Sequence, residues 1–115
     1  MRPLPYSHSS ALATLDRLGS TTPTQLAVQE GVRKPSITRV LAILEQQGLV
    51  RRATDPTDAR QNIVRITPAG RRAVTESRQL VDQWYRSLLA QIEPEDVQTL
   101  RESLPALRAL ADKTY

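Results

Sequence analysis

The sequence contains no cysteine and a single histidine, and these scarcities exclude most common catalytic and metal-binding arrangements. Without thiols there is no disulfide, no thiolate metal site and no cysteine redox sensor. A serine–histidine–aspartate unit or a histidine-rich metal site would have to use His8, which lies in a polar stretch near the N-terminus. The four glycines are too widely spaced for a phosphate-binding loop. We therefore predict that the chain is not an enzyme and requires no cofactor or metal.

Long hydrophobic runs are also missing. No apolar stretch approaches the roughly 20 residues that a membrane-spanning helix needs. The start of the chain, MRPLPYSHSS, lacks the apolar segment of a signal peptide. The 115 residues are enough for one domain with its own core. We expect a cytoplasmic protein with no membrane partner.

Positive charge is plentiful but unevenly distributed. The net charge is +4, yet residues 31–72 hold nine basic and three acidic side chains, a balance of +6. Residues 73–115 hold five basic and seven acidic side chains, a balance of −2. A basic middle and an acidic end predict one surface for nucleic acid and a second surface with another role.

The stretch GVRKPSITRVLAILEQQG, residues 31–48, is predicted to form the central helix. One face carries the apolar residues Ile37, Val40, Leu41 and Leu44, and the opposite face carries Pro35, Arg39, Ala42 and Gln46. Gly48 stands where a C′ glycine ends a helix. Arg33 and Lys34 are unusual at a helix N-terminus, where cations are unfavourable. A phosphate there would meet both cations and free backbone N–H groups.

The segments before this helix complete a helix-turn-helix pattern. A first helix is predicted over residues 7–18, with Ala11, Leu12, Leu15 and Leu18 as its apolar stripe, followed by a turn at residues 20–22. A short second helix, residues 23–30, starts with the cap-and-proline pair Thr22–Pro23. We expect Val32 to act as an apolar plug in the turn that follows.

Two strands follow the central helix. Residues 49–53 and the β-branched stretch of residues 61–67 are predicted to form a hairpin around the polar turn TDPTDAR, residues 54–60. A helix-turn-helix followed by such a hairpin is a winged helix. The predicted fold class is therefore mainly α with a small β-hairpin wing (α+β).

Two further helices end the chain. One starts at Thr67–Pro68 and runs to about residue 91, and the other starts at Pro94 with a heptad-like apolar seam. Pro105 should kink or break the last helix. We expect a winged helix-turn-helix DNA-binding region over residues 1–72 and C-terminal dimerisation helices over residues 73–115, within one compact domain.

The motifs resemble those of the MarR (multiple antibiotic resistance regulator) family. GVRKPSITRVLAILEQQGLVRR is similar to its recognition helix and first wing strand, and DPTDARQNIVRITPAG is similar to its wing. Arg33 and Ala59 depart from the family pattern, and the family's usual N-terminal helix is not found before Leu4. The resemblance implies a homodimeric, ligand-responsive repressor that binds palindromic double-stranded DNA.

The resemblance also implies roles for individual residues. Pro35, Ser36, Thr38 and Arg39 would face the major groove, while Arg60 would enter the minor groove and Asp58 would hold it. Together with the basic side chains of the helix and wing, the predicted DNA-binding residues are Arg33, Lys34, Pro35, Ser36, Thr38, Arg39, Arg51, Arg52, Asp58, Arg60 and Arg65. The predicted dimerisation residues are Leu80, Val81, Trp84, Leu88, Val97, Leu100, Leu104 and Leu107.

Two other classes of function are compatible with a small helical domain. A winged helix can serve as a protein-interaction adaptor that makes no direct DNA contact, and a small hydrolase is a third possibility. The basic segment favours DNA binding over an adaptor, because phosphate contacts need that charge. The lack of a convergent set of titratable residues argues against a hydrolase.

Overall fold

A computed structural model describes residues 4–58 and 62–114. The chain divides into two compact units, Met1–Gln79 and Leu80–Tyr115, which are described separately. Helix α4 (Pro68–Leu89) begins in the first unit and ends in the second.

The first unit opens with the two predicted short helices, α1 (Tyr6–Leu18) and α2 (Pro23–Glu30). The predicted cap of α2 is confirmed, because the Gln25 N–H donates to the Thr22 hydroxyl at 3.2 Å and Pro23 occupies the first turn. The Glu30 carboxylate accepts hydrogen bonds from the hydroxyl groups of Ser10 (2.7 Å) and Thr14 (2.6 Å). These bonds tie the end of α2 to α1.

Helix α3 (Lys34–Gln46) is the predicted central helix. Gly48 has a φ of 74°, and its N–H donates to the Glu45 carbonyl at 3.0 Å. The Leu49 N–H donates to the Leu44 carbonyl at 2.9 Å. This pair of bonds is a Schellman motif with glycine at C′, so the predicted end of the helix is confirmed.

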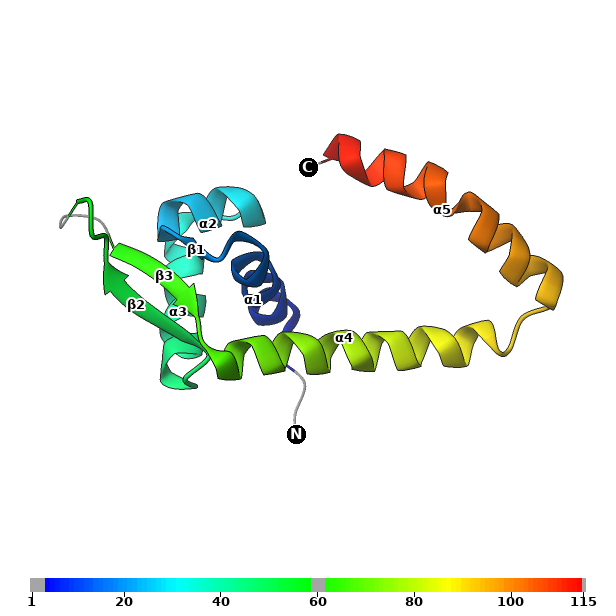
Figure 1. Ribbon diagram of the computed structural model, residues 1–115, viewed down its shortest axis with the longest axis horizontal. Coiled ribbons are helices and arrows are strands. Elements are labelled where there is room, and N and C mark those ends of the chain that lie inside the picture. The colour runs from blue at the N-terminus through cyan, green and yellow to red at the C-terminus, as the bar shows by residue number, and fades with distance from the viewer. Residues whose placement is uncertain (1–3, 59–61, 115) are drawn as a thin grey trace. The chain divides into compact units, whose positions relative to one another are not determined.

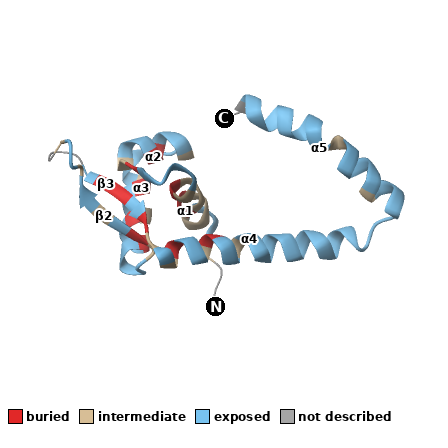
Figure 2. Cartoon of the chain, viewed as in Figure 1, coloured by how far each residue is buried: buried red, intermediate tan, exposed pale blue. Residues whose placement is uncertain are grey.

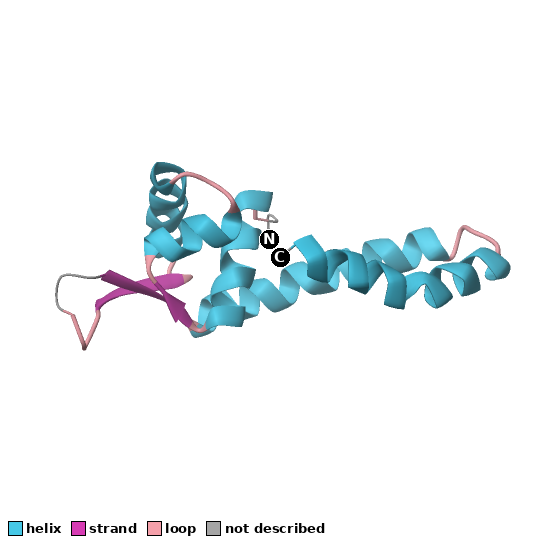
Figure 3. Ribbon diagram, turned by 90° about the horizontal axis from the view of Figure 1, so that it is seen from above, coloured by secondary structure: helices cyan, strands magenta, loops and turns pink. Residues whose placement is uncertain are grey.

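The first unit also contains an antiparallel sheet of three strands in the order β1-β3-β2. Strands β2 (Val50–Thr54) and β3 (Asn62–Ile66) form the predicted hairpin, which projects beyond the helices (Figure 3). Strand β1 (Ser20–Thr21) pairs with the other edge of β3, so the prediction of a simple turn there is wrong. Two residues are too few for an alternating pattern, and only the distant β3 makes them a strand.

The core of the first unit lies where α1, α2 and α3 meet the inner face of the sheet and the start of α4 (Figures 1 and 2). The largest fully buried side chains come from α1, α2, α3 and β3: Leu12, Leu15, Leu26, Leu41, Leu44 and Val64. Val32 is 45% exposed, so it is not a plug in the turn, and Leu18 is 41% exposed at the end of its predicted stripe.

The start of α4 is joined closely to the end of α3. The Thr67 hydroxyl caps α4 by accepting from the Gly70 N–H at 3.1 Å, and it donates to the Gly48 carbonyl at 2.6 Å. The Thr67 N–H donates to the Leu49 carbonyl at 3.0 Å. A Cβ added to buried Gly70 would lie well inside van der Waals distance of the Leu49 carbonyl oxygen and 2.6 Å from Ile66 Cγ1. Only glycine lets the two segments approach so closely.

The second unit contains the rest of α4 and helix α5 (Pro94–Thr114). Helix α5 starts at the predicted proline with Glu95 and Asp96 in its first turn, which suits the positive end of the helix dipole. Pro105 lies inside α5, which continues past it, so the helix does not break there. None of the helices in the described part of the chain is long and apolar enough to cross a membrane.

Candidate nucleic-acid interface

Helix α3 is amphipathic in the predicted sense. Ile37, Leu41 and Leu44 are buried, and Val40 packs against the same core. The opposite face is exposed along its length, at Pro35, Arg39, Ala42 and Gln46. The helix is therefore anchored on one side and offers the other side, including the Arg39 guanidinium, to a partner.

The start of α3 offers fewer backbone donors than the sequence suggested. Arg33 is the N-cap residue, with an extended backbone and no side-chain capping bond, as expected from its chemistry. Pro35 has no N–H, and the Ser36 N–H donates to the Arg33 carbonyl at 3.0 Å. Attraction of an anion to this helix end therefore rests mainly on the exposed cationic side chains of Arg33 and Lys34.

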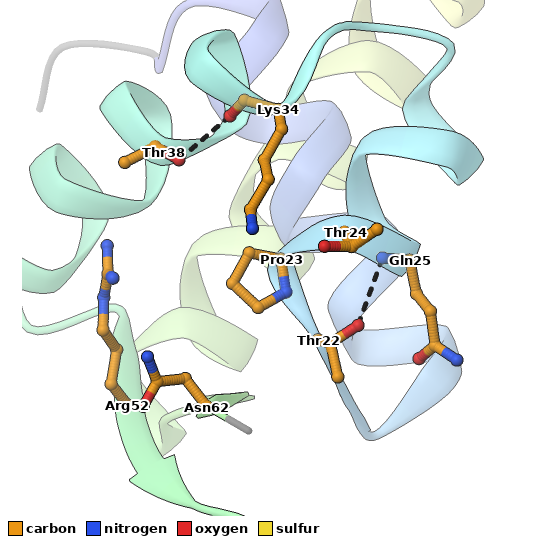
Figure 4. Close-up of a pocket in the computed structure, with 8 residues that line it drawn as sticks. All are labelled: Thr22, Pro23, Thr24, Gln25, Lys34, Thr38, Arg52 and Asn62. Atoms are coloured by element: carbon orange, nitrogen blue, oxygen red, sulfur yellow. Dashed lines mark hydrogen bonds between the residues drawn. The ribbon is translucent and has the colours of Figure 1, made fainter. Parts of the chain in front are cut away.

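A polar hollow of about 510 Å³ lies between α3, the start of α2 and the wing. In Figure 4 the Lys34 side chain extends into this hollow, and the Arg52 side chain extends from β2 towards α3. The Thr38 hydroxyl donates to the Lys34 carbonyl at 2.9 Å. The hollow is completed by residues that were not predicted as site residues: Thr22, Pro23, Thr24, Gln25 and Asn62.

The predicted basic residues of the wing divide between the two faces of the sheet. Arg52 pairs with buried Val64 and lies on the inner face, where its Nε is 3.6 Å from Glu45 Oε1 on α3. Arg51 pairs directly with Arg65 on the outer face, beside a smaller hollow of about 200 Å³. Strand alternation, with a period of two, is the sequence signal that separates these neighbours. The basic residues of the wing, which were predicted as one group, therefore belong to two separate surfaces.

The turn between the wing strands is described only in part. Asp55 accepts hydrogen bonds from the Thr57 N–H (2.8 Å) and the Thr57 hydroxyl (2.7 Å). These two hydrogen bonds hold the pKa of Asp55 below its ordinary value of 3.8, and the bond from the backbone N–H has the larger effect. Asp58 is partly buried, but Arg60 lies outside the described residues, so the predicted Asp58–Arg60 contact is not described.

The predicted dimerisation residues lie in the second unit. On α4, the side chains of Leu80, Val81 and Trp84 are 51–57% exposed, and Leu88 is 39% exposed. On α5, Leu100, Leu104 and Leu107 are 48–52% exposed, while Val97 is partly buried. Figure 2 accordingly colours most of this part of α4 and of α5 as exposed.

This geometry defines a class of protein. A short helix and a second helix with a free polar face, followed by a basic two-stranded wing, form a winged helix-turn-helix. In this class the second helix is the one that reads DNA.

Comparison with known proteins identifies the family. Residues 4–61 match the MarR family. Over 112 residues the chain is 38% identical to an HTH-type transcriptional regulator of Mycobacterium bovis, a match that covers 97% of this chain and 78% of the relative. The chain therefore belongs to the MarR family of DNA-binding transcriptional regulators, whose members are not enzymes.

Solved structures agree with this assignment. The chain is similar to the crystal structure of a cysteine-to-serine mutant of MarR from E. coli, with a TM-score of 0.80 and 26% identity over 90% of this chain and 77% of the other. The crystal structure of such a mutant complexed with operator DNA has a TM-score of 0.68 and 26% identity, over 90% of this chain and 75% of the other.

Proposed function

We propose that the protein is a ligand-responsive repressor that binds a palindromic operator in double-stranded DNA as a homodimer. The observation that carries DNA binding is the convergence of two cations on one polar hollow, the exposed Lys34 from α3 and the partly buried Arg52 from β2. The relative solved with operator DNA supports this role, since it shares the fold at 26% identity. The ligand response rests on family membership, and a small-molecule effector is part of this proposal.

In this proposal the DNA-binding residues have different roles. Arg39, exposed in the second turn of α3, reads base edges, because an arginine there can donate two hydrogen bonds to guanine. Pro35, Ser36 and Thr38 face the same groove. Lys34 and Arg52 line the hollow and bind backbone phosphate, which fixes the position of the helix without reading sequence.

The outer face of the wing contributes less directly. Arg51 and Arg65 point away from the face that carries Arg52, so they raise the positive potential of the domain rather than sharing its phosphate. Arg33 adds to the same field at the start of α3. Arg60, which the family resemblance assigns to the minor groove, is proposed to enter it, with Asp58 holding it in place.

The homodimer is proposed to form through the second unit. The exposed apolar side chains on α4 and α5 are too numerous for isolated surface residues, and a second copy would cover them. A twofold axis through this region would place the two copies of α3 roughly 34 Å apart, one turn of DNA. The negative balance of residues 73–115 fits a surface that faces away from phosphate.

Selection of bound duplexes from a random library tests this function. We expect a palindromic site, and binding to it should weaken linearly on a log–log plot against salt, with a slope of about −0.9 per neutralised phosphate. Arg39→Ala should lower the preference for the selected site over a scrambled duplex by about tenfold or more. Arg17→Ala, which removes an exposed cation from α1, is the matched control and should keep the preference.

Two results would contradict the proposal. A protein that selects no site and binds with no salt dependence is not a DNA reader, and an adaptor role would then be favoured. An equal loss of affinity for selected and scrambled DNA in Arg39→Ala would remove Arg39 from base reading. Sedimentation at several concentrations tests the homodimer separately.

A further inference from the structure

Glu45 and Arg52 form an ion pair between the recognition helix and the wing. Glu45 lies in the last turn of α3 and Arg52 lies in the middle of β2, with Arg52 Nε 3.6 Å from Glu45 Oε1. The side chains are 46% and 32% exposed, so both are accessible to a partner. The Arg52 Nε is buried and has no hydrogen-bond partner in the described part of the chain. The pair is therefore an attraction without a hydrogen bond.

The position of Glu45 is unfavourable for the helix and for DNA binding. It is the only acidic residue between Gly31 and Thr54, a stretch with five cations. A carboxylate in the last turn of a helix faces the negative end of the helix dipole. A carboxylate beside a phosphate-binding surface also repels the ligand. Neither helix stability nor general DNA affinity accounts for an acid at this position.

The arrangement around Arg52 accounts for it. The guanidinium is a planar fork with five N–H donors, so one edge can face a carboxylate while the other faces a phosphate. The ion pair with Glu45 holds this fork on the α3 side of β2. Arg52 also lines the hollow, together with Lys34 and Thr38 (Figure 4). Arg52 is then directed to a phosphate placed in register with α3, rather than to phosphates in other positions.

We propose that Glu45 is a specificity-determining residue that positions Arg52 and repels DNA bound out of register. This inference rests on the proposed DNA-binding function. A duplex in register with α3 places a phosphate against Arg52 and binds despite the repulsion from Glu45. A duplex in another position is repelled by Glu45 and lacks the phosphate contact with Arg52. The carboxylate thus lowers affinity for non-specific DNA more than affinity for the selected site.

A double-mutant cycle tests this inference. Wild type, Glu45→Gln, Arg52→Gln and the double variant are each titrated with the selected site and with a scrambled duplex at fixed salt. Glu45→Gln should raise the affinity for the scrambled duplex by a factor up to about fivefold larger than the factor for the selected site. A ratio of this size corresponds to the coupling energy of a partly exposed ion pair. In the Arg52→Gln background this difference should disappear. Glu76→Gln, which removes an exposed acid from α4, is the charge control.

Glu45→Asp separates positioning from charge. It keeps the negative charge but shortens the side chain, which moves the carboxylate away from Arg52. We expect it to lower the preference for the selected site as Glu45→Gln does, with thermal unfolding confirming that each variant is folded. A wild-type preference in Glu45→Asp, or an equal effect of Glu45→Gln with and without Arg52, would overturn the inference. Failure of the proposed function is distinct, because wild type itself would then prefer no site.

Discussion

Gly70 lies where the start of α4 meets Leu49, the residue that follows the end of α3, and its replacement by alanine tests this close approach. In an exposed helix position, Gly→Ala stabilises by about 1 kcal/mol, because alanine loses less backbone entropy. At Gly70 the new methyl group would lie 2.6 Å from Ile66 Cγ1 and still closer to the Leu49 carbonyl oxygen, where ordinary contacts are 3.4–4 Å. The oxygen belongs to the backbone, so no change of rotamer relieves the contact.

The magnitude follows from three contributions. Overpacking of this kind costs about 1–3 kcal/mol. A shift of Leu49 also weakens its hydrogen bond from the Thr67 N–H, a bond that contributes about 0.5–1.5 kcal/mol. Subtracting the gain in helix propensity leaves an expected loss of about 1–3 kcal/mol in the free energy of unfolding. The melting temperature of a domain of this size should fall by about 4–8 °C for each kcal/mol.

Urea denaturation at constant protein concentration, followed by circular dichroism, measures this change. The matched control compares Gln79→Ala with Gln79→Gly, because Gln79 is exposed on the same helix. We expect the protein with alanine at residue 79 to be more stable than the protein with glycine there. At residue 70 we expect the alanine variant to be less stable than the wild type with glycine. If Gly70→Ala raised stability as the control pair does, the close approach of α4 to Leu49 would be wrong.

Three further predictions concern the first unit. Thr22→Ala removes the cap of α2 and should lower the free energy of unfolding by about 1 kcal/mol, whereas Thr22→Ser should keep most of it. Arg51→Gln removes a like charge directly opposite Arg65 and should raise stability by about 0.2–1 kcal/mol at low salt, a gain that high salt should abolish. Because the pKa of Asp55 is lowered in the folded protein, its contribution to the stability of the turn should be present above pH 3.8. This contribution should be lost as the pH falls through the lower pKa of the folded state. Amide exchange at Thr57 should therefore accelerate in that acidic range, and Asp55→Ala should show fast exchange at all pH values.

Local chemistry made much of the fold predictable. Helix ends were correct where a cap or a glycine marks them, as at Thr22–Pro23 and Gly48, because these signals act within a few residues. The wing hairpin followed from the polar turn of residues 54–60 and the β-branched stretch of residues 61–67, with which residues 49–53 could pair. Strand β1 was missed because its pairing depends on residues more than forty positions away. Val32 was misplaced because an apolar side chain beside a turn does not have to be buried.

The candidate site was predictable in composition but not in geometry. The basic residues were identified from charge, yet only the strand register separates Arg51 from Arg52. The start of α2 was not predicted to line the hollow, because its polar residues are ordinary for a capped helix. The contact between Glu45 and Arg52 depends on how the wing folds back beside α3, and no local pattern reports that.

The strand order β1-β3-β2 leaves β2 with a neighbour on one side only within the described residues. An open strand edge is a template on which another chain can add a strand, the first step of aggregation. Charged side chains on such a strand oppose this, and β2 carries one on each face, Arg51 on the outer face and Arg52 on the inner face. The repulsion between Arg51 and Arg65 therefore has a second consequence, since the charge that weakens the folded wing also keeps wings of different molecules apart. A more stable Arg51→Gln wing should be the more prone to self-association.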